Sequence, residues 1–227
     1  LASKIIGLTQ SEFLKSFEIS IQVGAIFAVL VLYWRQLLLD AETFKRVAVA
    51  FLPTAVLGFI LHKFIKQFLI GNAGVVLWAL LLGGVFIILF ETFHRQKPDC
   101  PKTIRAISYR HSFLIGVCQA LAVIPGVSRS AATILGGLSL GIDRKTVVEF
   151  SFLLAIPTLA AATALDLIKS AHTFTFGQFE LLLVGTAVSF IVAIFSIRFF
   201  LKFITLHSFK AFGWYRVAVA MAFWILF

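Results

Sequence analysis

The chain has 227 residues, of which 60% are hydrophobic and 13% are charged, and its mean hydropathy is +1.02. This composition is too apolar for an ordinary soluble domain, in which about half of the residues are apolar. The net charge of +10 would suggest nucleic acid in a soluble protein, but here the basic residues lie in short segments between apolar runs. We therefore expect an all-α polytopic membrane protein that binds no nucleic acid.

Six apolar runs approach the length of about 20 residues that a helix needs to cross a bilayer. They are residues 17–34, 47–65, 75–93, 147–167, 179–203 and 212–227. A further stretch, 112–141, is broken by Pro125 and Gly126. Its first arm, 112–124, is about 20 Å long at about 1.5 Å per residue and reaches only to about the midplane. We expect a re-entrant hairpin here, and one kinked helix that crosses fully is the alternative.

The basic residues favour re-entry. If 112–141 returns to its own side, one face carries Arg35, Lys45, Arg46, Arg95, Lys97, Lys102, Arg105, Arg110, Arg144, Lys145, Arg198, Lys202, Lys210 and Arg216. The other face carries Lys4, Lys15, Lys63, Lys66 and Lys169. A full crossing would make the split nearly even. By the positive-inside rule the first face is cytoplasmic, which places the C-terminus outside.

Arg129 carries a full charge within the broken stretch. Such a side chain at membrane depth costs at least about 2.5 kcal/mol, so it persists where it faces a cavity or a partner. Pro125 and Gly126 end one half-helix, and the next presents free backbone N–H groups and its positive dipole end to the break. The planar guanidinium fits phosphate oxygens in a bidentate manner. The pattern predicts an anion site, with a snorkelling or purely structural arginine as the alternative.

The chain also repeats itself weakly. Residues 78–90 resemble 215–227, and Phe17-Glu18 and Glu149-Phe150 each open a set of three spans. Because three is odd, the second set must run inverted, an arrangement that holds ionic ligands near the midplane in other membrane proteins. We expect a first repeat in 1–97, a cytoplasmic connector in 98–111 and a second repeat in 112–227. The counterpart of the broken loop would fall at or before the first residues, so we expect the first hairpin to lie outside this sequence.

The broken loop resembles a family signature. Pro125-Gly126-Val127-Ser128-Arg129-Ser130-Ala131-Ala132-Thr133 is similar to the Pro-Gly-x-Ser-Arg-Ser-x-x-Thr motif of the bacterial undecaprenyl-pyrophosphate phosphatases, the family associated with bacitracin resistance. Residues 17–24, 108–110 and 149–157 are similar to the family as well. The resemblance implies an inner-membrane enzyme that removes the terminal phosphate of a C55 polyprenyl diphosphate, so that the carrier lipid of cell-wall synthesis is reused. It also implies two inverted repeats with two re-entrant loops.

The family's other signature, a glutamate-rich segment leading into Ser-Ser-Thr-Gly-His, has no match in this sequence. We therefore expect no metal-ligand set in this chain, with the ligands of a divalent cation, Mg or Ca, mostly outside it. A diphosphate needs its charge neutralised before the phosphate leaves, and its nucleophile needs a base. The candidate catalytic residues are Arg129 and Ser128. The candidate phosphate-binding residues are Gly126, Val127, Ser128, Arg129, Ser130 and Thr133.

The hydroxyls of this set are equally well explained as caps of the half-helix. Candidates of lower rank are Gln119, Glu18 and Glu149, and a structural role at a helix end is the alternative for both glutamates. The lipid tail would lie between spans, near Gly83, Gly84 and the last helix. A secondary transporter or flippase for an anionic lipid is the alternative function, because broken helices and inverted repeats are typical of transporters too. The expected partners are the membrane and the lipid, with a homodimer left open.

Overall fold

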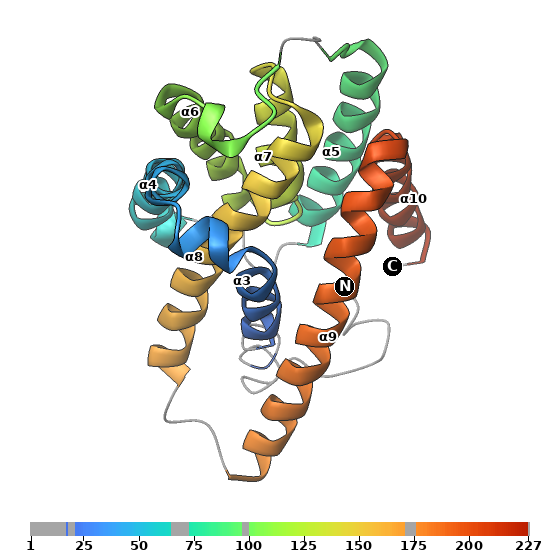
Figure 1. The fold of residues 1–227 in the computed structure, drawn as a ribbon. Helices are drawn as coiled ribbons and strands as arrows, with labels where there is room; N and C mark the ends of the chain where they lie inside the picture. The colour runs from blue at the N-terminus through green and yellow to red at the C-terminus, as the bar shows by residue number, and fades with distance from the viewer. Residues whose placement is uncertain (1–16, 18–20, 65–72, 97–99, 171–175, 227) are drawn as a thin grey trace. The chain divides into compact units, whose positions relative to one another are not determined.

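The computed structural model describes residues 17, 21–64, 73–96, 100–170 and 176–226 (Figure 1). Within them, eight α-helices and two short 3-10 helices occur without any strand. They are α3 (Gln22–Leu38), α4 (Ala41–Phe64), α5 (Ala73–Phe93), η2 (Ile104–Ala106), α6 (Tyr109–Ala120), η3 (Leu121–Val123), α7 (Arg129–Ser139), α8 (Arg144–Ser170), α9 (Phe176–Leu206) and α10 (Lys210–Leu226). The all-α class predicted from composition is confirmed.

Four helices are long and apolar enough to cross a membrane by length and composition: α4, α5, α8 and α9. The helices α3 and α10 have 17 residues each, about 26 Å at the rise of an α-helix. Large apolar side chains stand exposed on the long helices, among them Phe59 of α4 (86%) and Phe195 of α9 (68%). Surfaces of this kind are lipid-facing rather than water-facing. The chain is a helical membrane protein, as its sequence predicts.

The chain forms two compact units, one of Leu1–Arg35 with Ala155–Phe199 and the other of Gln36–Leu154 with Phe200–Phe227. In the first, Gly24 of α3 lies against the α9 backbone, where a Cβ would come within 2.8 Å of the Phe190 nitrogen. The boundaries 1–97, 98–111 and 112–227 proposed from the repeat stay predictions. The second unit contains the Pro-Gly loop.

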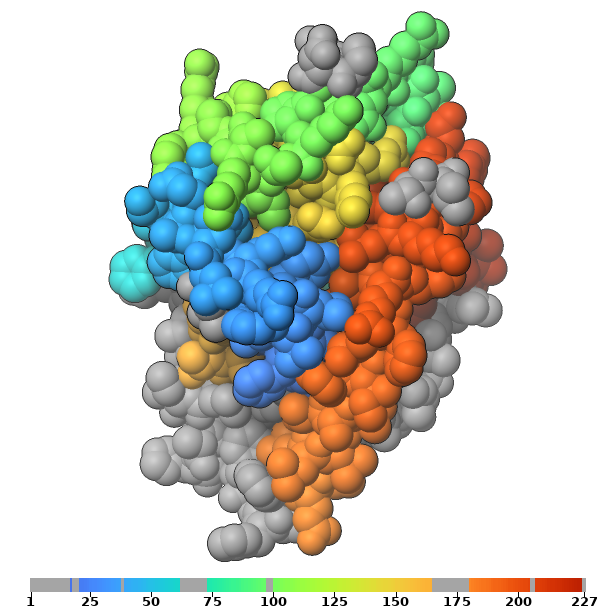
Figure 2. All heavy atoms as spheres, in the orientation of Figure 1, coloured from blue at the N-terminus to red at the C-terminus, as the bar shows by residue number. Residues whose placement is uncertain are grey.

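Glycines set the close helix contacts of the second unit. A Cβ on Gly84 of α5 would lie 2.8 Å from the Gly213 carbonyl oxygen of α10, and a Cβ on Gly213 would lie 2.8 Å from the Gly84 oxygen. Gly116 of α6 meets the Ala50 backbone of α4 in the same way. Gly84 is therefore buried in a helix contact, which corrects the expectation that it borders an open groove. Figure 2 shows α6 (green) and α7 (yellow) meeting at the surface of this unit.

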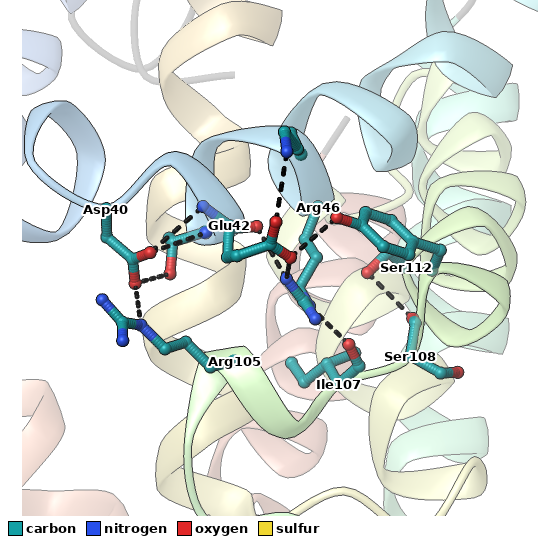
Figure 3. Close-up of polar contacts among 10 residues, drawn as sticks. Asp40, Glu42, Arg46, Arg105, Ile107, Ser108 and Ser112 are labelled. Atoms are coloured by element: carbon teal, nitrogen blue, oxygen red, sulfur yellow. Dashed lines mark hydrogen bonds and ion pairs between the residues drawn. The ribbon is translucent and has the colours of Figure 1, made fainter.

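The start of α4 is fixed by an acidic cap. Asp40 Oδ1 accepts hydrogen bonds from the backbone N–H groups of Glu42 (3.1 Å) and Thr43 (3.3 Å), as N-cap residues do. Asp40 Oδ2 accepts from Arg105 Nε at 2.7 Å (Figure 3). The Arg105 hydrogen bond is the largest cause that lowers the pKa of Asp40 to about 2.

An ion pair within α4, between Arg46 and Glu42, also contacts the segment that precedes α6 and the first residue of α6 (Figure 3). Arg46 Nη1 donates to Glu42 Oε2 at 2.6 Å, and Arg46 Nε donates to the Ile107 carbonyl oxygen at 2.6 Å. The Tyr109 hydroxyl donates to the same Glu42 oxygen at 2.8 Å, and its ring centroid lies 4.7 Å from the Arg46 guanidinium. These contacts place the first turn of α6, which leads into the Pro-Gly loop.

Candidate phosphate-binding site

The broken stretch folds as two half-helices that pack against each other, α6 and α7. Between them, the Val127 N–H donates to the Ile124 carbonyl at 3.1 Å and closes a turn over Pro125 and Gly126. Gly126 has φ +94, a conformation that glycine adopts without steric cost. The predicted helix break is therefore confirmed. The depth of this hairpin in a membrane stays a prediction.

The Pro-Gly turn lies directly against α5. A Cβ on Gly126 would lie 2.6 Å from the Val76 carbonyl oxygen and 2.9 Å from Ala79 Cβ. Backbone atoms cannot yield as the end of a flexible side chain can, so only glycine fits this contact. The turn that carries the candidate site is thus held by α5 as well as by its own half-helices.

Arg216 of α10 joins the turn to α5. Its Nη2 donates to the Gly126 carbonyl at 2.8 Å and to the Ala79 carbonyl at 3.0 Å, and the residue is only 9% exposed. The basic-residue count treats Arg216 as a loop charge on one face. The structure corrects this, because Arg216 belongs to α10 and its side chain is buried against α5 and the Pro-Gly turn. The signal was present in the sequence, because Arg216 lies within the last apolar run, where the argument made for Arg129 applies equally.

Arg129 is the first residue of α7, where free backbone N–H groups and the helix dipole favour an anion. Its Nη1 is buried and has no hydrogen-bond partner, and no ion pair involves Arg129 within the described residues. A buried donor without an acceptor costs about 1 to 3 kcal/mol, and more when it is charged. An anionic ligand would satisfy this donor.

Ser128 and Ser130 stand together at the same helix start. Ser128 Oγ accepts from the Ala131 N–H at 3.2 Å, so it caps α7, and it lies 3.1 Å from Ser130 Oγ. Both serines line a cavity of about 300 Å³. The capping role left open from the sequence is therefore real for Ser128, and the cavity gives both hydroxyls access to a ligand.

Thr133 lies apart from this cavity. It is fully buried, and its Oγ1 is 2.6 Å from Ser151 Oγ of α8. The same hydroxyl lies 3.1 Å from the Arg129 carbonyl oxygen and 3.0 Å from the Ser130 carbonyl oxygen. Its hydroxyl is thus engaged by partners on α7 and α8. In this conformation Thr133 links α7 to α8 and does not border the cavity, and its phosphate-binding role stays a prediction.

The candidates of lower rank are dispersed. Gln119 is 1% exposed, donates from Nε2 to Thr54 Oγ1 at 2.9 Å, and has an unpartnered buried Oε1. Glu149 lies in the second turn of α8, with Lys145 Nζ 4.0 Å from its Oε1. Glu18 lies outside the described residues. Neither Gln119 nor Glu149 borders the cavity beside Ser128.

Two cavities adjoin the start of α7, and they share Ser128 and Arg216. The smaller, about 230 Å³, is also bordered by Gly83 and Val127. The larger, about 300 Å³, is also bordered by Ser130 and by aromatic residues. Arg129 is not among the residues that line these two cavities. The structure thus brings Ser128 and Ser130 together with Arg216, a residue that the sequence-based set does not contain.

A metal ion would need oxygen, nitrogen or sulfur ligands that converge on one point. In the part of the chain that the structure describes, no group of three or more His, Cys, Asp or Glu side chains meets this requirement. The described residues therefore do not fit a divalent cation by themselves.

Comparison with known proteins identifies close relatives. The family described as "Bacitracin resistance protein BacA" matches residues 1–222. The undecaprenyl-diphosphatase of Aquifex aeolicus is 48% identical over 223 residues, which are 98% of this chain and 87% of that protein. The undecaprenyl-diphosphatase of a Sulfurihydrogenibium species is 46% identical over 99% of this chain and 88% of its own length. The undecaprenyl-diphosphatase of Bdellovibrio bacteriovorus is 43% identical over 226 residues, which are 100% of this chain and 86% of that protein.

Proposed function

The chain belongs to the BacA family of bacitracin resistance proteins, and we propose on this basis that it is an integral membrane undecaprenyl-diphosphatase. It removes the terminal phosphate of undecaprenyl diphosphate and so returns the lipid carrier to cell-wall synthesis. The observation that carries the assignment to a site is the unpartnered buried nitrogen of Arg129 at the start of α7.

The reaction is the hydrolysis of a phosphoric anhydride. Water adds to the terminal phosphorus, the bond to the bridging oxygen breaks, and undecaprenyl phosphate and inorganic phosphate are formed. Charge builds up on the bridging and terminal oxygens as this bond breaks. Arg129 and the free N–H groups of α7 stabilise that charge, and Ser128 and Ser130 offer hydroxyls for positioning the phosphate. Gly126 and Val127 supply the turn that aims these groups.

We further propose that α6 and α7 form a re-entrant hairpin and that the chain consists of two inverted repeats in the bacterial inner membrane. Two half-helices that meet at a break support the hairpin. With Arg216 removed from the count, the face that carries Arg95, Arg105 and Arg144 remains the more basic one. It is therefore proposed to be cytoplasmic, with the C-terminus outside. A homodimer stays a prediction.

A divalent cation, Mg or Ca, stays a proposal that rests on the charge of the substrate. When bound, such an ion would neutralise diphosphate oxygens.

Arg129→Lys and Arg129→Ala test the assignment. Phosphate release from undecaprenyl diphosphate by the purified protein in detergent should fall by about 100-fold or more in both variants, because a point charge does not replace the planar two-pronged donor. The matched control is Arg198→Lys at an exposed arginine of α9, which should release phosphate at the wild-type rate. Near-normal release by Arg129→Lys would refute the bidentate role. A wild-type protein that transfers intact diphosphate without releasing phosphate would refute the enzyme assignment.

A further inference from the structure

The cavity of about 300 Å³ beside α7 has a polar end and an apolar wall. Ser128, Ser130 and Arg216 form the polar end. Three rings contribute to the wall: Phe200 near the end of α9, Phe209 in the turn before α10, and Phe212 in the first turn of α10. These rings pack on one another, with the centroids of Phe200 and Phe212 5.3 Å apart at an interplanar angle of 78°. A cavity with this division of polarity fits an amphiphile.

Arg216 has donors to spare at the polar end. A guanidinium carries five N–H donors, and only those of Nη2 are used, on the Gly126 and Ala79 carbonyls. Its Nε is buried without a partner, and its Nη1 makes no hydrogen bond among the described residues. Gly83 makes room for this group, because a Cβ there would lie 2.6 Å from Nη2. A cation more than nine-tenths buried, with unpaired donors beside a cavity, calls for an anionic acceptor.

We propose that this cavity binds the substrate at the junction of its head and its chain. Arg216, Ser128 and Ser130 contact a phosphate, and the rings of Phe200, Phe209 and Phe212 contact the first isoprene units. The proposal rests on the proposed function for the class of substrate, an isoprenoid diphosphate. It assigns to Arg216 a direct contact with substrate, separate from the role of Arg129.

Size and exposure agree with this assignment. A volume of about 300 Å³ lies at the lower end of the range for ligand sites, so the cavity holds the junction and not a long chain. Phe212 is 39% exposed, so the wall is open at this ring and leaves an exit for the rest of the chain. Arg216 also holds the Gly126 carbonyl, so the phosphate contact and the Pro-Gly turn share one side chain.

The test compares two non-hydrolysable probes, methylenediphosphonate and the same group carrying a farnesyl chain, by calorimetric titration of the detergent-purified protein. The wild type should bind the farnesyl probe at least about tenfold more tightly than methylenediphosphonate, a difference of about 1.4 kcal/mol. Phe212→Ala should remove most of this difference while leaving the affinity for methylenediphosphonate unchanged. Phe212→Leu keeps part of the apolar volume and should therefore retain part of the preference for the farnesyl probe. Arg216→Gln should weaken both probes.

Phe59→Ala is the matched control, because Phe59 is an exposed ring of α4 at 86% exposure and does not border the cavity. This variant corrects for partition of the farnesyl chain into micelles. It should bind both probes with the wild-type affinity. Equal effects of Phe212→Ala and Phe59→Ala on the farnesyl probe would overturn the chain site. If Arg216→Gln does not fold, Arg216→Lys replaces it, and unchanged binding of both probes by the folded variant would overturn the head contact. Phosphate release by the wild type is measured separately, so a failure of the enzyme assignment is recognised independently of these affinities.

Discussion

Replacing Gly126 with alanine tests whether the Pro-Gly turn is held against α5. Two costs combine at this position. A left-handed backbone costs an L-residue about 1 to 2 kcal/mol. The new Cβ would also lie 2.6 Å from the Val76 carbonyl oxygen, and overpacking of this kind costs about 1 to 3 kcal/mol. Together they predict that Gly126→Ala lowers the free energy of unfolding by about 2 to 5 kcal/mol if the turn stays in place.

Two other glycines separate these costs. Gly141 also has a positive φ, +77, but a Cβ there would meet nothing within 4 Å. Gly141→Ala should therefore lower the free energy of unfolding only by the backbone cost, about 1 to 2 kcal/mol. Gly58 lies within α4 and is open as well, so Gly58→Ala should be neutral or slightly stabilising. The three variants share one chemical change and differ in conformation and contact.

The assay pairs thermal unfolding in detergent with phosphate release. We expect the unfolding midpoint to be highest for Gly58→Ala, lower for Gly141→Ala and lowest for Gly126→Ala. Phosphate release should fall about 100-fold for Gly126→Ala alone, because a shift of about 1 Å in the turn misplaces Ser128 and Arg129. If Gly126→Ala has the same unfolding midpoint as Gly141→Ala and releases phosphate at the wild-type rate, then the contact with α5 does not position the site.

Three further predictions concern other parts of the second unit and the topology. Thr133→Val should lower stability by about 1 to 3 kcal/mol by leaving Ser151 unpaired, with the KM unchanged; a raised KM at unchanged stability would show that Thr133 binds phosphate. With Cys100 and Cys118 replaced, a cysteine at Gln96 should react with an impermeant thiol reagent from the cytoplasm and one at Ser170 from outside; labelling of both from the same side would contradict the re-entrant topology. The Arg105 hydrogen bond holds the pKa of Asp40 at about 2, below the ordinary value of 3.8, so its stabilising contribution is complete above about pH 4 and is lost as the pH falls through about 2. Arg105→Ala should weaken this acid dependence in unfolding experiments, and an unchanged profile would exclude the pair as its source.

The sequence by itself determined the class of protein and predicted the place of the candidate site. Apolar runs of near bilayer length give the helices, since hydropathy acts locally along each run. The Pro125-Gly126 pair ends one half-helix, and Ser128 begins the next, because the restricted φ of proline and the capping oxygen of serine act within a few residues. Arg129 was identified by the cost of a charge among apolar neighbours.

Only the tertiary structure decided which groups meet there. Arg216 is 90 residues from Gly126 and 137 from Ala79, yet one nitrogen bonds both carbonyls. The contact of Gly126 with Val76 and the bond from Thr133 to Ser151 likewise depend on how separate helices pack. Helix packing is set by the fit of whole surfaces, including the Gly84 and Gly213 contact of α5 with α10. A local pattern of residues therefore marks Arg216 as unusual but does not reveal that it reaches the loop.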